Sequence, residues 1–388
     1  MRLAIYAPAF VGLLTGCSML LDIPAAVFAS LCLLARLVAA RPTTTLLVWG
    51  AVYVPLCGIW LVPALDGLVE LSIGVLGLVL SGALFYGVPA LLLSRLLARL
   101  PELIMPLSIL MGELAALGCG LVLAPIGLAA VNTPLAPCMR VITVFGVSGL
   151  LALLASTLFV RRRRSYLSGF IAAALVMLIP IGSDPRFDGP LPIGISHHPD
   201  AKQKWSAGHA KDVLQALMDA SAPYVGQGLI VWPENAVTTG FNLDKAASQV
   251  QALGAPVLFG MTRFANPGSP ELRNSAVLVT PSGMQVSDKR HLAPLIEAGF
   301  WPFTRSDMQS GDRRMLVLGD GTRILPLICY EAAFPIDLAD FDTPPDLIVV
   351  LAAETGFAPR LAGSLMKRHA LARQVETGLP VLRVSDVP

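Results

Sequence analysis

The hydrophobic positions of this chain follow two different patterns, which meet near residue 182. Before that point, apolar runs long enough to cross about 30 Å of hydrocarbon follow one another with short polar breaks. A segment that crosses lipid must satisfy its own backbone hydrogen bonds, so each run is expected to be a helix. Residues 1–182 are therefore predicted to form a transmembrane domain of about seven helices, at 3–21, 23–40, 44–65, 71–94, 103–131, 141–160 and 166–182.

The arginines of this half predict its orientation, because positive residues favour cytoplasmic loops. With a cytoplasmic N-terminus, the outer loops carry Arg140 together with three acids, Asp22, Asp66 and Glu70. The cytoplasmic side then collects the other nine arginines, which are Arg2, Arg36, Arg41, Arg95, Arg99 and 161–164. An odd number of crossings places the rest of the chain on the far side. The predicted location is the bacterial inner membrane, multi-pass, with a periplasmic C-terminal domain.

One acidic residue, Glu113, lies inside the fifth predicted helix. An ionisable group in lipid is costly and usually has a function. A place near the interface, or a partner inside the bundle, would explain Glu113 equally well.

After residue 190 the pattern changes to short β-rich runs that alternate with helical stretches. Helices are predicted at 206–222 and 361–377, and two hairpins are expected to turn at 281–283 and at Asp320–Gly321. Single strands are predicted at 191–196, 228–235, 255–261, 346–353 and 379–385. Interleaved strands and helices indicate an α/β layer domain, here 183–388, with a largely buried sheet.

Composition fits this division. The chain is 55% hydrophobic and only 14% charged, and its mean hydropathy is +0.69. Residues 1–182 hold ten Arg, no Lys and five acids, and the remainder holds 18 basic and 21 acidic residues. The net charge of +2 is therefore the sum of a basic membrane half and a mildly acidic soluble half. It does not indicate nucleic-acid binding.

Cys329 is the only cysteine after residue 183. Oxidising compartments favour paired cysteines, and this domain cannot form a disulfide within itself. A lone thiol there has either a chemical function or the role of a small buried apolar side chain.

Three reactive residues follow predicted strands. Glu234 closes "LIVWPEN", Lys289 follows "MQVSD", and Cys329 closes "ILPLIC". We expect the ends of adjacent strands to bring them to one edge of the sheet. A carboxylate can take the proton of a thiol, and an ammonium can stabilise the oxyanion of a tetrahedral intermediate. Together they form a set suited to acyl transfer through a thioester.

The three motifs resemble those of the nitrilase (carbon–nitrogen hydrolase) superfamily, and above all its membrane branch, the apolipoprotein N-acyltransferases. The resemblance implies an αββα sandwich after the membrane domain. "WPEN" would place the general base at Glu234, and "DKRHLAPLIE" would place the catalytic lysine at Lys289 and a supporting acid at Glu297. "ICYEAAFP" would place the nucleophile at Cys329 and a second supporting acid at Glu331.

The chain departs from that family at several points. Ile296 stands where a glycine is usual, and "AAETGFA" at 352–358 replaces an Asn-Asp-Ala-Trp-Phe-Gly-like loop. The family also continues beyond the position of Pro388. With "HLAPLIEAGFWPF", these features resemble the TraB proteins of conjugative plasmids. The alternative is a non-catalytic membrane scaffold of a conjugation apparatus that retains the nitrilase fold.

The resemblance also implies the partners. A membrane phospholipid would be the acyl donor, a protein or peptide amine the acceptor, and other conjugal transfer proteins further partners. Direct nucleic-acid binding is not expected, and neither is a cofactor. A metal hydrolase would rest on His197, His198 and His209, but their spacing matches no zinc signature.

Overall fold

The computed structural model divides the chain into two compact units, Met1–Ser183 and Asp184–Pro388. The structure describes residues 3–61, 71–159, 187, 189–196, 209–238, 242–266, 268–294, 296–298 and 306–387.

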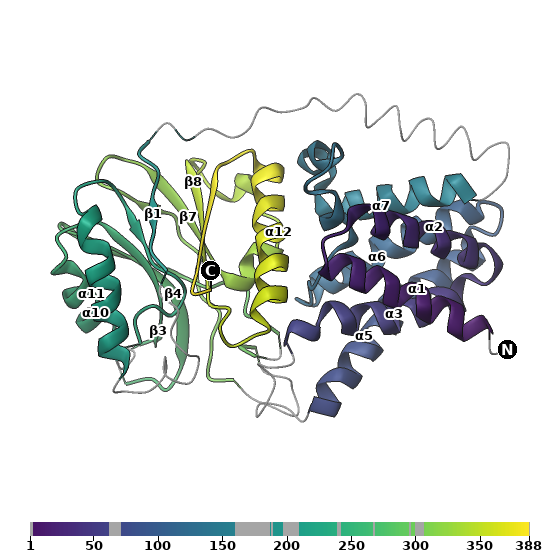
Figure 1. Cartoon of the computed structure of the whole chain (residues 1–388), viewed down its shortest axis with the longest axis horizontal. Coiled ribbons are helices and arrows are strands. Elements are labelled where there is room, and N and C mark those ends of the chain that lie inside the picture. The colour runs from purple at the N-terminus through teal and green to yellow at the C-terminus, as the bar shows by residue number, and fades with distance from the viewer. Residues whose placement is uncertain are drawn as a thin grey trace. The chain divides into compact units, whose positions relative to one another are not determined.

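The described part of the first unit consists mainly of helices (Figure 1). Among the described residues, four helical stretches are long and apolar enough to cross a membrane, and two further apolar helices, at Ile5–Leu20 and Pro24–Ala40, are shorter. The seventh predicted run, 166–182, lies outside the described residues. The helices are α1 (Leu3–Leu20), α2 (Pro24–Ala40), α3 (Pro42–Cys57), α5 (Leu71–Leu96), α6 (Ile104–Gly118) and α7 (Met139–Phe159), with short 3₁₀ turns η1 (Ile59–Leu61), η2 (Pro101–Leu103), η3 (Ile126–Ala130) and η4 (Ala136–Cys138).

Small residues and aromatic rings hold α3 against α5. A Cβ added to Gly50 would collide with the backbone oxygen of Gly82, so the two helices approach closely only because both positions are glycine. Beside this contact, Trp49 stacks on Tyr53 at 4.6 Å, and Tyr86 meets Trp49 edge-on at 4.9 Å.

The predicted helix at 103–131 is wrong in its second half. Helix α6 ends at Gly118, and Gly120 has a φ of +72°, which an L side chain rarely adopts. The following residues are buried without being helical, and Val122 is 2% exposed. Side chains supply partners for this backbone, because Tyr53 donates to Ala124 O at 2.6 Å. Non-helical backbone is tolerated at membrane depth only when protein satisfies it in this way.

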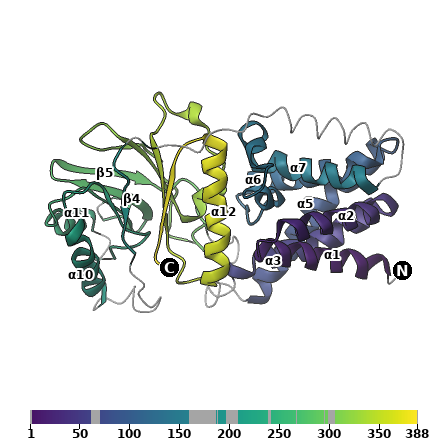
Figure 2. The same cartoon turned by 45° about the horizontal axis from the view of Figure 1, so that its top comes forward.

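The second unit contains two sheets (Figures 1 and 2). One has the order β1-β2-β3-β4-β5, with parallel pairing from β1 to β3 and antiparallel pairing from β3 to β5. The other has the order β6-β7-β8-β9, antiparallel at β6–β7 and otherwise parallel. The strands are β1 (Ile193–Gly194), β2 (Ile230–Val231), β3 (Val257–Phe264), β4 (Leu272–Thr280), β5 (Gly283–Asp288), β6 (Leu316–Val317), β7 (Arg323–Ile328), β8 (Leu347–Ala352) and β9 (Val381–Ser385).

The two sheets face each other across an apolar core, to which Leu258 and Leu278 of the first sheet and Val349 of the second contribute. Helices α10 (His209–Ser221) and α11 (Leu243–Gln251) cover the outer face of the first sheet. Helix α12 (Pro359–Thr377) covers the outer face of the second. The layers are therefore αββα, and the predicted fold class, a helical membrane domain followed by a nitrilase-like sandwich, is confirmed.

Local turn chemistry explains which elements the sequence predicts well. Both hairpins form with their turns at the expected places, and Gly283 and Gly321 adopt the positive φ that these turns need. Helix α11 is not among the predicted elements. Its amphipathic pattern spans only nine residues, and Asn242 caps it by accepting from Lys245 N at 2.9 Å.

Candidate functional site

Glu234 lies in a tight turn after β2, held against β3. A Cβ on Gly260 of β3 would lie 2.5 Å from Glu234 Cα, so only glycine permits this approach. The next residue, Asn235, has a left-handed φ of +52°, and its side chain accepts a 2.9 Å hydrogen bond from Thr262 Oγ1. The Glu234 carboxylate is thereby fixed at the end of the sheet, with only 4% of the residue exposed.

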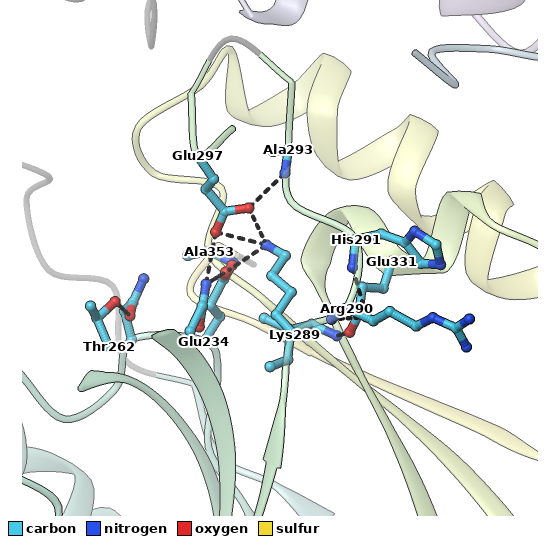
Figure 3. Close-up of polar contacts among 12 residues, drawn as sticks. Glu234, Thr262, Lys289, Arg290, His291, Ala293, Glu297, Glu331 and Ala353 are labelled. Carbon is cyan, nitrogen blue, oxygen red and sulfur yellow. Dashed lines mark hydrogen bonds and ion pairs between the residues drawn. The ribbon is translucent and has the colours of Figure 1, made fainter. Parts of the chain in front are cut away.

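Lys289 follows β5 and is 1% exposed (Figure 3). Its Nζ lies 2.7 Å from Glu297 Oε2 and 3.4 Å from Glu234 Oε1. Asn274 bridges the same two acids, because its Nδ2 donates to Glu234 Oε1 at 2.6 Å and to Glu297 Oε1 at 2.9 Å. Glu297 Oε2 also accepts from Ala293 N at 2.7 Å. One buried cation therefore lies between two carboxylates that an amide group joins.

Cys329 stands on a sharp turn at the end of β7. It is partly buried, begins the 3₁₀ turn η6 (Cys329–Ala333), and has a φ of +52°. Such a conformation is strained for a non-glycine residue and often marks a functional site. The turn is held by Glu331, whose carboxylate accepts from Ile328 N at 2.9 Å and from Arg290 N at 2.8 Å. Glu331 thus joins the Cys329 turn to the loop that carries Lys289.

Glu234 and Lys289 are in contact, and Cys329 lies near enough for both to act electrostatically on its thiol, but not for the reason the sequence suggests. Strands β2 and β5 are not neighbours, and β7 belongs to the other sheet. The expectation of adjacent strand ends in one sheet is therefore wrong. The residues come together because the ends of two facing sheets border one site. Of the two supporting acids, Glu331 accepts from backbone amides, whereas Glu297 contacts Lys289 Nζ.

The charges of the site act on one another. Burial raises the pKa of the Cys329 thiol well above its usual value, Glu234 raises it further, and Lys289 partly offsets both. Burial alone would lower the pKa of Lys289, but Glu297 and Glu234 outweigh that effect and raise it. At neutral pH the site therefore holds a protonated lysine beside a neutral thiol. A thiol in this state needs a base to become a nucleophile.

The loop after β8 closes the site from the second sheet. Ala353 N donates to Glu234 Oε2 at 2.9 Å, which fixes the second oxygen of that carboxylate. Glu354 is 1% exposed and is held by Arg383 and by Ser385 Oγ at 3.0 Å. Its backbone N–H donates to Asp386 Oδ1 at 2.6 Å. Hydrogen bonds of Ala353 and Glu354 therefore hold the start of the "AAETGFA" segment at the edge of the site.

Two contributors are missing from the residues that the sequence singles out. Asn274 lies in β4, 40 positions from Glu234, so strand pairing alone brings them together. Asp288 precedes Lys289 and is bound by Arg263 Nη2 at 2.8 Å and Ser275 Oγ at 2.6 Å. The first sheet thus anchors the strand end that carries the lysine. In the sequence, the polar residues 273–275 at strand positions are the feature that could have pointed to this part of the site.

The described residues contain no group of three or more His, Cys, Asp or Glu side chains that could hold a metal ion. His197 and His198 lie outside the described residues. The charged groups that act on the Cys329 thiol include the Glu234 carboxylate and the Lys289 ammonium ion. This combination can carry a proton away from a thiol and stabilise negative charge on a carbonyl oxygen.

The part of the sequence that carries this site is similar to a known protein family. Residues 202–387 match the carbon–nitrogen hydrolase family. An apolipoprotein N-acyltransferase of Brucella suis is 29% identical over 228 residues, covering 51% of this chain and 43% of that protein. An apolipoprotein N-acyltransferase of Allorhizobium ampelinum is 27% identical over 180 residues, covering 41% and 34%. The chain therefore spans less than half the length of these curated relatives.

Among solved structures, an amidase from Nesterenkonia sp. is similar with a TM-score of 0.35 and 19% identity, covering 50% of this chain and 74% of the amidase. A carbon–nitrogen hydrolase from Helicobacter pylori has a TM-score of 0.37 and 14% identity, covering 50% and 72%.

Proposed function

We propose, from the premise that residues 202–387 form a carbon–nitrogen hydrolase domain, that this membrane protein is an acyltransferase that carries an acyl group on Cys329. The observation that supports this most is the buried Lys289, held between Glu234 and Glu297 at 3.4 and 2.7 Å. Burying a lysine and two acids is costly, and a structural role could be filled by apolar side chains. Such clusters with shifted pKa values are typical of active sites.

In the first half-reaction, Glu234 takes the proton of the Cys329 thiol as Sγ attacks the carbonyl carbon of an ester. Lys289 donates a hydrogen bond to the oxyanion of the tetrahedral intermediate. The ester C–O bond then breaks, and the proton held by Glu234 passes to the departing alkoxide. The products are a thioester on Cys329 and a free alcohol.

In the second half-reaction, an amine attacks the thioester carbon. Glu234 takes a proton from the amine nitrogen, the C–S bond breaks, and that proton returns to Sγ. The products are an amide and the original thiol, so atoms and charges balance over the cycle. Glu297 and Asn274 position Lys289 and Glu234, and Glu331 positions the Cys329 turn. Water in place of the amine would give a hydrolase.

The proposed acyl donor is a membrane phospholipid, and the proposed acceptor is the amine of a protein or peptide. Relatives named apolipoprotein N-acyltransferase and four helices able to cross a membrane support this assignment. The arginine distribution of the sequence supports a cytoplasmic N-terminus and a periplasmic catalytic domain. Thiol labelling from either side of the membrane, with single cysteines placed at Arg36 and Arg140, tests this orientation.

Transfer itself is tested in proteoliposomes that contain phospholipid with a labelled acyl chain and a lipoprotein-like peptide with a free N-terminal amine. Wild type is expected to move the label to the peptide as an amide. Cys329→Ser and Glu234→Gln should each abolish transfer, whereas Glu271→Gln, at an exposed position with no proposed role, should not. Labelled free fatty acid in place of labelled peptide would identify a hydrolase.

We further propose that this activity serves plasmid conjugal transfer, on the resemblance of the sequence to TraB proteins. A mating assay with the gene deleted from the donor tests it. Complementation by wild type but not by Cys329→Ser would support a catalytic role in conjugation. Equal complementation by both would favour a membrane scaffold, and unchanged mating after deletion would remove the conjugal role.

A further inference from the structure

The first unit contains a small pocket, lined mostly by apolar groups, that the proposed acyl transfer does not use. It lies among α3, α5, α6 and the non-helical residues after Gly118, and its lining includes Tyr53, Cys57, Tyr86 and Glu113. Its volume is about 30 Å³. A cavity needs roughly 10–15 Å³ and two to four polar partners to hold one water molecule, so this one has room for one or two.

Glu113 is the polar centre of this cavity. Only 3% of the residue is exposed. Its Oε1 accepts a 2.8 Å hydrogen bond from Ile126 N, which fixes the end of the non-helical segment. Its Oε2 is buried and has no hydrogen-bond partner in good geometry among the described residues. The carboxyl group is therefore half satisfied, and its free oxygen belongs to a residue that lines the cavity.

The hydroxyl groups next to the Glu113 carboxyl also bond to backbone groups. Ser148 can hydrogen-bond the Glu113 carboxyl, but it shares its one hydroxyl with Val144 O at 3.2 Å and with Gly127 N, from which it accepts at 2.7 Å. Tyr53 directs its proton to Ala124 O at 2.6 Å. Its oxygen can still accept a hydrogen bond, and the phenol of Tyr86 is a further polar group of the lining.

The energetic cost of burying a charge restricts the protonation state of Glu113. A carboxylate at membrane depth costs several kcal/mol unless a cation accompanies it. The salt bridges of the described residues include none with Glu113. A neutral carboxyl avoids this cost, but its O–H then needs an acceptor. A water molecule supplies both a donor and an acceptor, which an apolar ligand cannot do.

We propose that this cavity is a hydration site, in which one or two water molecules bind a protonated Glu113 inside the membrane unit. The water bridges Glu113 Oε2 to the tyrosine hydroxyl groups of the lining. In this way the carboxyl group satisfies the backbone of the non-helical segment through one oxygen and the water through the other. The site is selective for a small neutral hydrogen-bonding molecule, because a lipid chain offers Oε2 no partner.

Infrared spectroscopy of the full chain in lipid nanodiscs at neutral pH tests the proposal. Wild type should show the carbonyl band of a protonated carboxylic acid that is hydrogen-bonded and shifts on exchange into D₂O. Glu113→Gln, which keeps an oxygen for Ile126 N, should remove that band. Glu102→Gln is the matched control, because Glu102 is also buried, at 8% exposure, but does not line the cavity. It should leave the Glu113 band in place.

A second variant keeps the test independent of any folding defect in Glu113→Gln. Ala116→Leu adds apolar volume to the cavity lining and leaves every atom of Glu113 in place. It should expel the water and move the carbonyl band to the higher frequency of a carboxyl group without a hydrogen bond. An unshifted band in Ala116→Leu would overturn the hydration site. Stabilisation by Na⁺ or K⁺ that Glu113→Gln abolishes would also overturn it, in favour of a cation site.

Discussion

The carboxylate of Glu331 gives the most quantitative prediction for the second unit. Its Oε1 accepts from Arg290 N at 2.8 Å and from His291 N at 3.3 Å, and its Oε2 accepts from Ile328 N at 2.9 Å. The residue is 1% exposed. These three backbone donors belong to two segments, the turn of Cys329 and the loop of Lys289.

Glu331→Gln preserves the shape and removes one acceptor. The new amide group must face either Ile328 N or the Arg290–His291 pair, so at least one buried N–H meets another donor. A hydrogen bond to a charged group contributes about 1.5–3 kcal/mol, and an unsatisfied buried group costs about 1–3 kcal/mol. We expect a loss of roughly 2–4 kcal/mol in the free energy of unfolding. For a domain of this size, that lowers the melting temperature by roughly 5–15 °C.

The assay is thermal unfolding in nanodiscs, followed by tryptophan fluorescence, together with the alkylation rate of Cys329 resolved by peptide mass spectrometry. The left-handed φ of Cys329 costs about 1–2 kcal/mol and needs its surroundings to persist. The alkylation rate should therefore change along with stability. Glu271→Gln, at an exposed position, should shift stability by less than about 0.5 kcal/mol. Equal melting temperatures and equal alkylation rates for the two variants would refute the reasoning.

Three further outcomes are expected. Lys289→Met should slow alkylation of the nucleophile at alkaline pH, because Lys289 lowers the pKa of the thiol; an unchanged rate would contradict this. Burial, reinforced by nearby arginines, lowers the pKa of His291 to about 4 from an ordinary value near 6.5, so its contribution to stability is complete above pH 6.5 and is lost as the pH falls toward 4. Urea midpoints measured across that range should fall less steeply for His291→Phe than for wild type, and parallel curves would exclude the effect. Gly260→Ala should destabilise by about 1–3 kcal/mol, since its Cβ would lie 2.5 Å from Glu234 Cα, whereas Gly319→Ala, with open space around it, should be tolerated; equal urea midpoints would contradict the close approach.

Much of the second unit can be predicted from sequence because its signals are local. The glycines at 283 and 321 mark hairpin turns, and short continuous apolar runs mark buried strands such as β3, β7 and β8. The site could be predicted as a set of residues but not as a geometry. The geometry depends on how two facing sheets place the strand ends that carry Glu234, Lys289 and Cys329. No single sequence motif indicates the order of the strands in those sheets.

The membrane unit shows a different limit. Hydropathy does not distinguish the helix that ends at Gly118 from the buried non-helical residues that follow it. That end depends on Tyr53, which is 71 positions from the Ala124 oxygen that it binds. Asn274 is a similar case in the second unit, because its bridge between two acids exists only after strands pair. Contacts between distant residues decide such features, and periodicity reports only near neighbours.

The most direct measurement of the central claim is the intact mass of the purified protein after incubation with phospholipid, compared among wild type, Cys329→Ser and Glu234→Ala. Thioester chemistry predicts a fatty-acyl mass increment on wild type that hydroxylamine removes and that both substitutions abolish. A folded, membrane-embedded wild type that gains no such increment, or an increment that persists in Cys329→Ser, would contradict acyl transfer through Cys329.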